Sequence, residues 1–246
     1  MATSFKKPKI CFFDSGIGGL TLLYECVRKL PCAEYVYFAD NYNVPYGSLS
    51  EDKLLNKADG VFRQISLLKP SAAVIACNTV TARCAGYLRE RYDFPILGIQ
   101  PAIKPAAAAG SCAVLATPAT ADSWALKELA VRCGMGRTEV LPCPELALYI
   151  ENNIYNIDKE KINALLPETR ADSIVLGCTH YSFVKKHIEK YYSRPVFDGN
   201  LGTAEHLRTF LGNFDHQPEN TGKIWFCGGD EKKNSHIFNN IETILK

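Results

Sequence analysis

Two stretches decide the fold: Ala73-Val-Ile-Ala-Cys77-Asn78-Thr79 and Ser173-Ile-Val-Leu-Gly-Cys178-Thr179-His180. Each is a short apolar run, rich in Val and Ile, that leads into a cysteine and then into hydroxyl or amide side chains. A run of four or five such residues is typical of a buried parallel strand. A segment of helical character follows each run, so each cysteine is predicted at the carboxyl end of a strand, where open α/β sheets bind ligands. The pair suggests two thiols that act on two faces of one small molecule.

The residues around the first stretch predict strands that alternate with helices. The predicted strands are 9–13, 34–38 and 94–99, and the predicted helices are 20–30, 51–68 and a segment that ends near 91. Asp14 and Ser15 are candidate N-cap residues for the first helix. The glycines after them lack the dinucleotide-binding pattern, because Thr21 stands where the third glycine should be. The turn is then either a plain connection or an anion site at a helix N-terminus.

The second half of the chain repeats this plan after a Pro- and Ala-rich stretch at 100–110, which predicts a domain boundary. Its predicted elements are strands 111–116, 139–141 and 195–197, helices 124–133, 145–150, 162–166, one through 190 and 203–211, a loop at 217–222, and a last strand 223–227 with a final helix. We therefore predict two similar α/β domains with mainly parallel sheets that face each other across a cleft. The first comprises residues 1–98 plus 205–246, and the second comprises residues 99–204.

Composition limits the function classes. The 246 residues carry a formal net charge of +2, too small to indicate a nucleic-acid or anionic-membrane partner. No apolar run approaches the roughly 18 residues of a transmembrane helix, and the start lacks the apolar region of a signal peptide, so a cytoplasmic location is expected. The ten cysteines include no Cys-x-x-Cys, and Cys178-x-His180 alone is too few ligands for zinc, so no metal is expected.

The predicted cleft gathers side chains that follow the strands. They are Asp14, Ser15, Pro45, Tyr46, Gly47, Ser48, Cys77, Asn78, Thr79, Thr117, Thr120, Cys178, Thr179 and His180. This set contains hydroxyls and amides but no Lys or Arg, so a small anionic amino acid would be held by helix N-termini and hydroxyls rather than by ion pairs. The two thiols are the good nucleophiles or bases between the strands. Asp14, Glu151 and His180 can adjust their protonation or relay protons.

Four motifs, in this order and spacing, resemble those of the glutamate racemases of the aspartate/glutamate racemase superfamily. They are Phe13-Asp14-Ser15-Gly16-Ile-Gly18-Gly19-Leu20, Pro45-Tyr46-Gly47, Ala76-Cys77-Asn78-Thr79 and Gly177-Cys178-Thr179-His180. The resemblance runs from about residue 9 to the end and includes Cys143-Pro144 with Glu151 after it. It implies inversion of glutamate at Cα by two cysteines without a cofactor, which supplies D-glutamate for peptidoglycan. The expected partner is thus the small-molecule substrate, and a homodimer is left open.

By this resemblance, Cys77 acts as base on the D-enantiomer and Cys178 on the L-enantiomer. Asp14 assists near Cys77, and Glu151 and His180 stand on the side of Cys178. The substrate-binding residues are expected to be Ser15, Pro45, Tyr46, Gly47, Ser48, Asn78, Thr79, Thr117, Thr120 and Thr179.

Some residues depart from the family pattern. Asn41 stands where the family usually has Thr. Ser182 stands where the family often has Pro directly after the Cys-Thr-His-Tyr motif. Neither removes a proposed catalytic group, but both bear on substrate preference. Two alternatives therefore remain: a racemase of aspartate or another small acid, and a non-catalytic amino-acid binder on the same fold.

Overall fold

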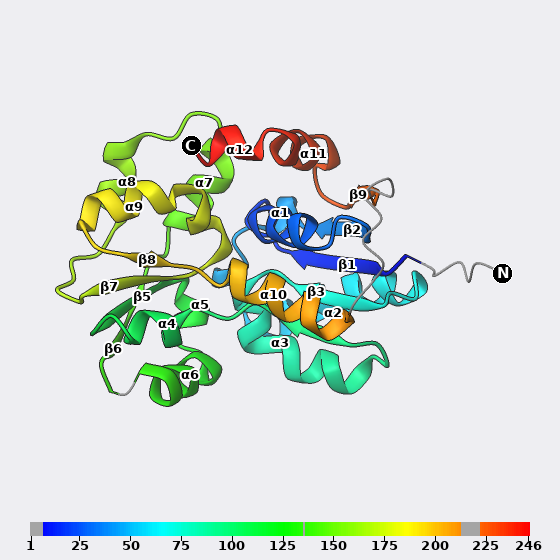
Figure 1. Ribbon diagram of the computed structural model, residues 1–246, viewed down its shortest axis with the longest axis horizontal. Coiled ribbons are helices and arrows are strands. Elements are labelled where there is room, and N and C mark those ends of the chain that lie inside the picture. Colours follow the sequence, from blue (N-terminus) through cyan, green and yellow to red (C-terminus); the bar gives the residue numbers. More distant parts are fainter. Residues whose placement is uncertain (1–6, 135, 213–221) are drawn as a thin grey trace.

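The molecule consists of two sheets in opposite halves, each with helices on both faces (Figure 1). The computed structural model describes residues 7–134, 136–212 and 222–246. Every strand pair within these residues is parallel. The predicted α/β class with two parallel sheets is confirmed.

The first sheet has the strand order β4-β3-β1-β2-β9. Its strands are β1 (Lys9–Asp14), β2 (Glu34–Ala39), β3 (Ala72–Ile75), β4 (Ile96–Gly98) and β9 (Ile224–Cys227). Along β1 the side chains alternate between two cores: Ile10 and Phe12 pack on one face of the sheet, and Cys11 and Phe13 pack on the other. Both faces are covered, which explains why the strand is apolar throughout rather than at alternate positions.

The second sheet has the strand order β6-β5-β7-β8. Its strands are β5 (Cys112–Ala116), β6 (Thr138–Pro142), β7 (Ser173–Gly177) and β8 (Val196–Phe197). Read from β8, this order matches β4-β3-β1-β2 of the first sheet, strand for strand in chain order. Cys77 follows β3 and Cys178 follows β7, so the two thiols occupy equivalent positions in the two halves.

Helices fill the segments between strands. They are α1 (Leu20–Lys29), α2 (Glu51–Leu67), α3 (Asn78–Arg91), α4 (Ile103–Ala107), α5 (Pro118–Ala121), α6 (Trp124–Gly134), α7 (Leu146–Asn153), α8 (Lys159–Leu165), α9 (Lys185–Tyr192), α10 (Asn200–Leu211), α11 (Glu231–Asn239) and α12 (Ile241–Ile244). The 3-10 helices of the described residues are η1 (Asn41–Asn43), η2 (Tyr46–Ser48) and η3 (Thr179–Val184).

Three local predictions were wrong. Asp14 and Ser15 do not cap α1, which begins at Leu20 with Gly19 at its N-cap; the Asp14 carboxylate instead accepts the Gly16 N–H at 2.8 Å. The segment after Cys178 begins as η3 and only then becomes the α-helix α9. Helix α10 begins at residue 200, three residues earlier than predicted, because Asp198 accepts the N–H of the first helical residue at 2.9 Å.

The chain passes from the first half to the second between β4 and α4, and α10 then packs on α1 in the first half. The exact domain limits, 98/99 and 204/205, stay a prediction. Of the predicted loop 217–222, residues 217–221 lie outside the described residues.

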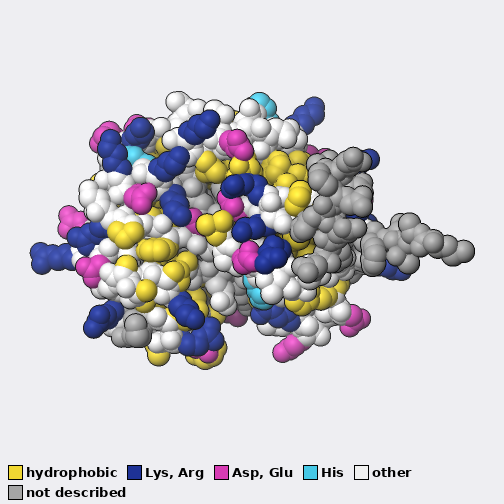
Figure 2. Space-filling model, in the orientation of Figure 1, with side chains coloured by type: hydrophobic (Ala, Val, Ile, Leu, Met, Phe, Trp, Pro, Cys, Tyr) yellow, Lys and Arg dark blue, Asp and Glu magenta, His cyan; other side chains and the backbone are white. Residues whose placement is uncertain are grey.

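Within residues 7–134, 136–212 and 222–246, no helix combines the length and apolar character needed to cross a membrane. Basic and acidic side chains are interspersed over the face in Figure 2.

Candidate active site

The first thiol, Cys77, lies between the end of β3 and the start of α3. It is buried, and its sulfur is 3.6 Å from Oγ of Ser15. Burial raises the pKa of the Cys77 thiol to about 12, and the negative charge of Asp14 adds to the rise. The Val80 N–H and the Ser15 hydroxyl oppose it, because they stabilise a thiolate. Cys77 is therefore protonated at neutral pH and can donate a proton.

The second thiol, Cys178, lies at the equivalent end of β7, directly before η3. Its sulfur is 3.9 Å from Nδ1 of His180, and Nε2 of the same ring is 2.7 Å from Oε2 of Glu151. Burial lowers the pKa of His180, but the bonds to Cys178 and Glu151 raise it well above its ordinary value. With its pKa raised in this way the ring is protonated at neutral pH, so Nε2–H donates to Glu151 and Nδ1–H faces the sulfur of Cys178. Cys178 and His180 can therefore exchange a proton, while Glu151 holds the ring in place.

Glu151 is buried, yet both of its carboxylate oxygens are fully bonded. Oε2 accepts from the Ile17 N–H at 2.9 Å and from His180. Oε1 accepts from the Asn41 amide at 2.8 Å and from the Lys233 ammonium at 3.2 Å. Burial alone would raise the pKa of Glu151, but His180, the Ile17 N–H and Lys233 lower it to about 2. Glu151 is therefore ionised at neutral pH.

Asp14 ends β1 and lies between the two thiol environments. It is wholly buried; one oxygen accepts the Gly16 N–H at 2.8 Å and the other accepts the Thr179 hydroxyl at 3.1 Å. Burial raises the pKa of Asp14, while the nearby His180 lowers it. Its charge acts on Cys77, and its hydrogen bond holds the residue that follows Cys178.

One small cavity, of about 10 Å³, has walls from both halves of the molecule. The predicted site residues that line it are Ser15, Pro45, Tyr46, Gly47, Cys77, Asn78, Thr79, Thr117, Cys178, Thr179 and His180. Asp14 and Glu151 lie behind this lining and touch it through Thr179 and His180. The hydroxyl of Tyr46, one of the lining residues, donates to Asp40 at 2.7 Å.

Two predicted binding residues stand outside the lining. Ser48 is exposed, and its hydroxyl donates to the carbonyl of Pro45 at 2.9 Å. Thr120 is buried behind Thr79 and Thr117, and the three hydroxyls lie 3.0 Å from one another. Thr120 therefore acts on the cavity through its two neighbours, and Ser48 is not brought to it.

A family model for Asp/Glu/hydantoin racemases matches residues 22–207. The chain belongs to this racemase family. As a member of the Asp/Glu/hydantoin racemases it is an isomerase.

Named relatives extend the match over nearly the whole chain. A glutamate racemase of Clostridium perfringens is 36% identical and covers 98% of this chain and 94% of its own length. Glutamate racemase 2 of Bacillus subtilis is 34% identical over 91% of this chain and 89% of its own. The solved glutamate racemase of Escherichia coli, in complex with L-glutamate and an activator, is 25% identical, with a TM-score of 0.81 over 97% of this chain and 96% of its own.

Sequence reasoning missed the residues that hold Glu151. Lys233 comes from α11, 82 positions further along the chain, and Asn41 is held by Asn234 of the same helix. No local pattern marks Lys233 as part of the site. Asn41 stood out only as a departure from the pattern of the Asp/Glu racemases. Val44 and Ala147 also line the cavity, and nothing in the sequence distinguishes them from ordinary apolar residues.

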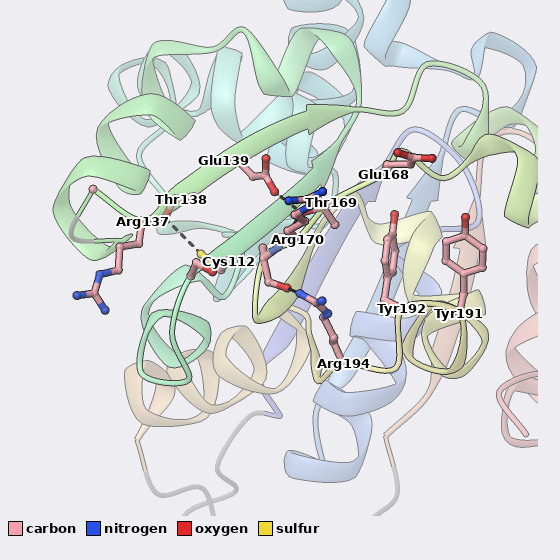
Figure 3. A pocket seen from close by; sticks show the side chains of 13 residues that line it. Cys112, Arg137, Thr138, Glu139, Glu168, Thr169, Arg170, Tyr191, Tyr192 and Arg194 are labelled. Atoms are coloured by element: carbon pink, nitrogen blue, oxygen red, sulfur yellow. Dashed lines mark hydrogen bonds between the residues drawn. The ribbon is translucent and has the colours of Figure 1, made fainter.

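A much wider cavity, of about 990 Å³, lies at the amino ends of β5 and β6, the edge of the sheet opposite Cys178 (Figure 3). Three arginines line it, but Arg137 points away from the other labelled side chains. Arg194 donates to the carbonyl of Ala171. These cations do not converge on one point, and the thiol cavity is the candidate active site. No group of three or more His, Cys, Asp or Glu within the described ranges could hold a metal ion.

Proposed function

We propose that this racemase interconverts L- and D-glutamate, with Cys77 and Cys178 as its two bases and without a cofactor. The observation that carries the proposal is that the two thiols follow equivalent strands and line one cavity from opposite halves. Inversion at Cα requires a proton to leave one face and another to arrive at the opposite face. Two groups placed on opposite sides do this without the substrate turning over.

From L-glutamate, the Cys178 thiolate removes the α-proton: the C–H bond breaks, an S–H bond forms, and the electron pair stays on Cα. The Cys77 thiol then gives its proton to the other face, where a new C–H bond forms and the thiolate of Cys77 remains. This product state is the starting state for D-glutamate, since Cys77 is now the base. The protein's own side chains thus accept the first proton and donate the second.

The surroundings of the two thiols support this division. The raised pKa of Cys77 keeps it protonated, as a proton donor must be. Beside Cys178, the Nδ1–H of the His180 imidazolium can stabilise a thiolate, and ionised Glu151 stabilises the imidazolium in turn. A histidinium beside a thiol favours the thiolate form, which is the form that can act as a base.

Substrate binding rests on neutral donors. No Lys or Arg is among the described residues that line the cavity. The 14-residue helix α3 begins directly after Cys77, and its first N–H groups favour a carboxylate. Hydroxyls of Ser15, Thr79 and Thr117 add donors along the wall. An acidic amino acid fits this set, and the named relatives favour glutamate over aspartate.

The proposal extends to the role of the product. The resemblance to glutamate racemases implies that D-glutamate made by this chain enters peptidoglycan. Expression of the chain in a bacterial strain that requires D-glutamate should restore growth without the supplement, and a Cys77→Ala variant should not. The cytoplasmic location stays a prediction, and a homodimer stays open.

The decisive test is isotopic. In heavy water, purified protein is given unlabelled L-glutamate, and both enantiomers are isolated early in the reaction. A thiol carries one proton, so the proton that Cys178 removed returns only to the face it left. D-glutamate should then carry deuterium at Cα, while the remaining L-glutamate is almost unlabelled. Early D-glutamate that keeps its original α-hydrogen would refute two bases, and racemisation of aspartate in preference to glutamate would refute the substrate.

A further inference from the structure

The carboxylate of Glu151 has four hydrogen-bond donors, two to each oxygen. An ionised carboxylate offers about four acceptor positions, so its hydrogen-bonding capacity is filled. Two of the four donors belong to the parts that sequence reasoning missed. The Lys233 ammonium reaches both Oε1, at 3.2 Å, and the carbonyl oxygen of Glu151, at 2.8 Å. It therefore holds the side chain and the backbone of the same residue.

The Asn41 amide is oriented by the start of α11. Its oxygen accepts from the Asp230 N–H at 3.2 Å and from the Asn234 amide at 2.9 Å. A backbone N–H can only donate, so the oxygen of Asn41 must face α11 and its NH₂ must face Glu151. Asn234 is wholly buried. The amino end of α11 thus fixes both donors to Oε1.

We infer that Lys233, together with Asn41, is a positioning residue of the racemase: it holds Glu151 as a fixed anion and so sets where His180 stands and how readily the Cys178–His180 pair loses its proton. This inference rests on the proposed function, since it assigns Cys178 as one of the two bases. It gives the C-terminal helix, far from the motifs in sequence, an effect on one side of the reaction.

The charges around Glu151 determine the sign of the effect. The ionisable groups that face it are His180 from η3, Lys233 from α11, Asp14 from β1 and Tyr37 from β2. Removal of the positive Lys233 favours the protonated form of every group nearby. The thiolate form of the Cys178–His180 pair should therefore appear only at higher pH. Cys77 contacts Ser15 and the charge of Asp14 instead, so its reactivity should change little.

The two sides cannot be separated by comparing kcat/KM in the two directions. L- and D-glutamate are mirror images, so their equilibrium constant is one, and the two kcat/KM values are equal in any variant. The reactivity of each thiol must be measured by itself. The protein is alkylated with iodoacetamide, and mass spectrometry follows the peptides that contain Cys77 and Cys178. Each sample gives the alkylation rate of both cysteines, and the measurement is repeated between pH 5 and pH 9.

The variants are Lys233→Met, which keeps length without charge, Lys233→Arg, which keeps the cation, and Lys232→Met, the same charge change at an exposed neighbour on α11. In Lys233→Met, the rise of the Cys178 alkylation rate with pH should occur about half a pH unit higher, or more. The alkylation rate of Cys77 should depend on pH as it does in wild type. The acid limb of kcat/KM should move with the Cys178 profile, and kcat/KM at pH 7 should fall about ten-fold. Lys233→Arg should restore most of both, and Lys232→Met should match wild type.

An unchanged Cys178 profile in Lys233→Met overturns the inference. An equal change in both thiols also overturns it, because that result indicates a general loosening of the cavity. If the unaltered protein does not racemise glutamate, the proposed function fails, yet the alkylation profiles still decide whether Lys233 acts on Cys178.

Discussion

Replacement of Gly18 by Ala should inactivate the enzyme by moving His180. Gly18 lies in the turn between β1 and α1, against the start of η3. A Cβ there would lie 2.5 Å from Oγ1 of Thr179, 2.6 Å from Nδ1 of His180 and 2.8 Å from the His180 backbone nitrogen. Ordinary contact begins at 3.4 Å, so even the longest of the three is about 0.6 Å too short. The backbone contact cannot be relieved by a rotamer change, and η3 must shift.

The shift acts on the atom that faces Cys178, since Nδ1 of His180 is now 3.9 Å from the sulfur. Displacement of a reacting group by close to 1 Å costs about 100-fold in rate, or about 2.7 kcal/mol of transition-state stabilisation. Overpacking should also lower the free energy of unfolding by about 1–3 kcal/mol. The expected kcat/KM, measured by circular dichroism of glutamate, is therefore about 1% of wild type in a protein that still folds, as urea unfolding can show.

Gly60→Ala is the matched control. Gly60 lies in α2, and a Cβ there would meet no atom within 4 Å. The change should leave kcat/KM within about two-fold and raise the free energy of unfolding by about 0.5–1 kcal/mol, because Ala favours helix. A folded Gly18→Ala protein with more than a third of wild-type activity would refute the contact argument, and so would an equal loss in Gly60→Ala.

Two further predictions concern the buried carboxylates. Asp14→Asn should raise Tm at pH 7 by about 2–4 °C and lower kcat/KM at least ten-fold, because the raised pKa of Asp14 means that its charge costs stability above that pKa. A lower Tm would contradict this. The pKa of Glu151 falls from 4.5 to about 2, so its stabilisation is complete above pH 4.5 and is lost as pH falls towards 2. The free energy of unfolding, measured with urea, should therefore fall by about 2 kcal/mol more in wild type than in Glu151→Gln between pH 5 and pH 3. A difference between the two proteins that does not change with pH would contradict this.

Much of the fold was predictable because local pattern and tertiary structure agree. The run 9–13 was assigned from apolar character alone, and β1 extends from Lys9 to Asp14. The helix predicted over 51–68 is α2, Glu51–Leu67. Burial on both faces of each sheet leaves such runs no other stable arrangement. The repeated plan also placed Cys77 and Cys178 at equivalent strand ends.

The rest was not predictable, because it depends on contacts between distant segments. Lys233 looks like an ordinary surface residue in the sequence. Its inferred role depends on its bond to the carboxylate of Glu151, 82 positions away. The Asn41–Asn234 pair joins residues 193 positions apart. Ser48 shows the opposite failure: it follows the Pro-Tyr-Gly motif closely, but the turn directs its hydroxyl to Pro45. The roles assigned to the site residues remain predictions until they are measured.

The thiol cavity, at about 10 Å³, has about the space that one water molecule requires. Glutamate, the proposed substrate, is far larger, so the residues that line the cavity must move apart to admit it and close again around it. While they are together, each thiol exchanges protons only with the substrate or its neighbours. Product release and the exchange of thiol protons with solvent therefore share one opening event. The frequency of that opening sets an upper limit on kcat and also fixes how much isotope exchange accompanies each inversion.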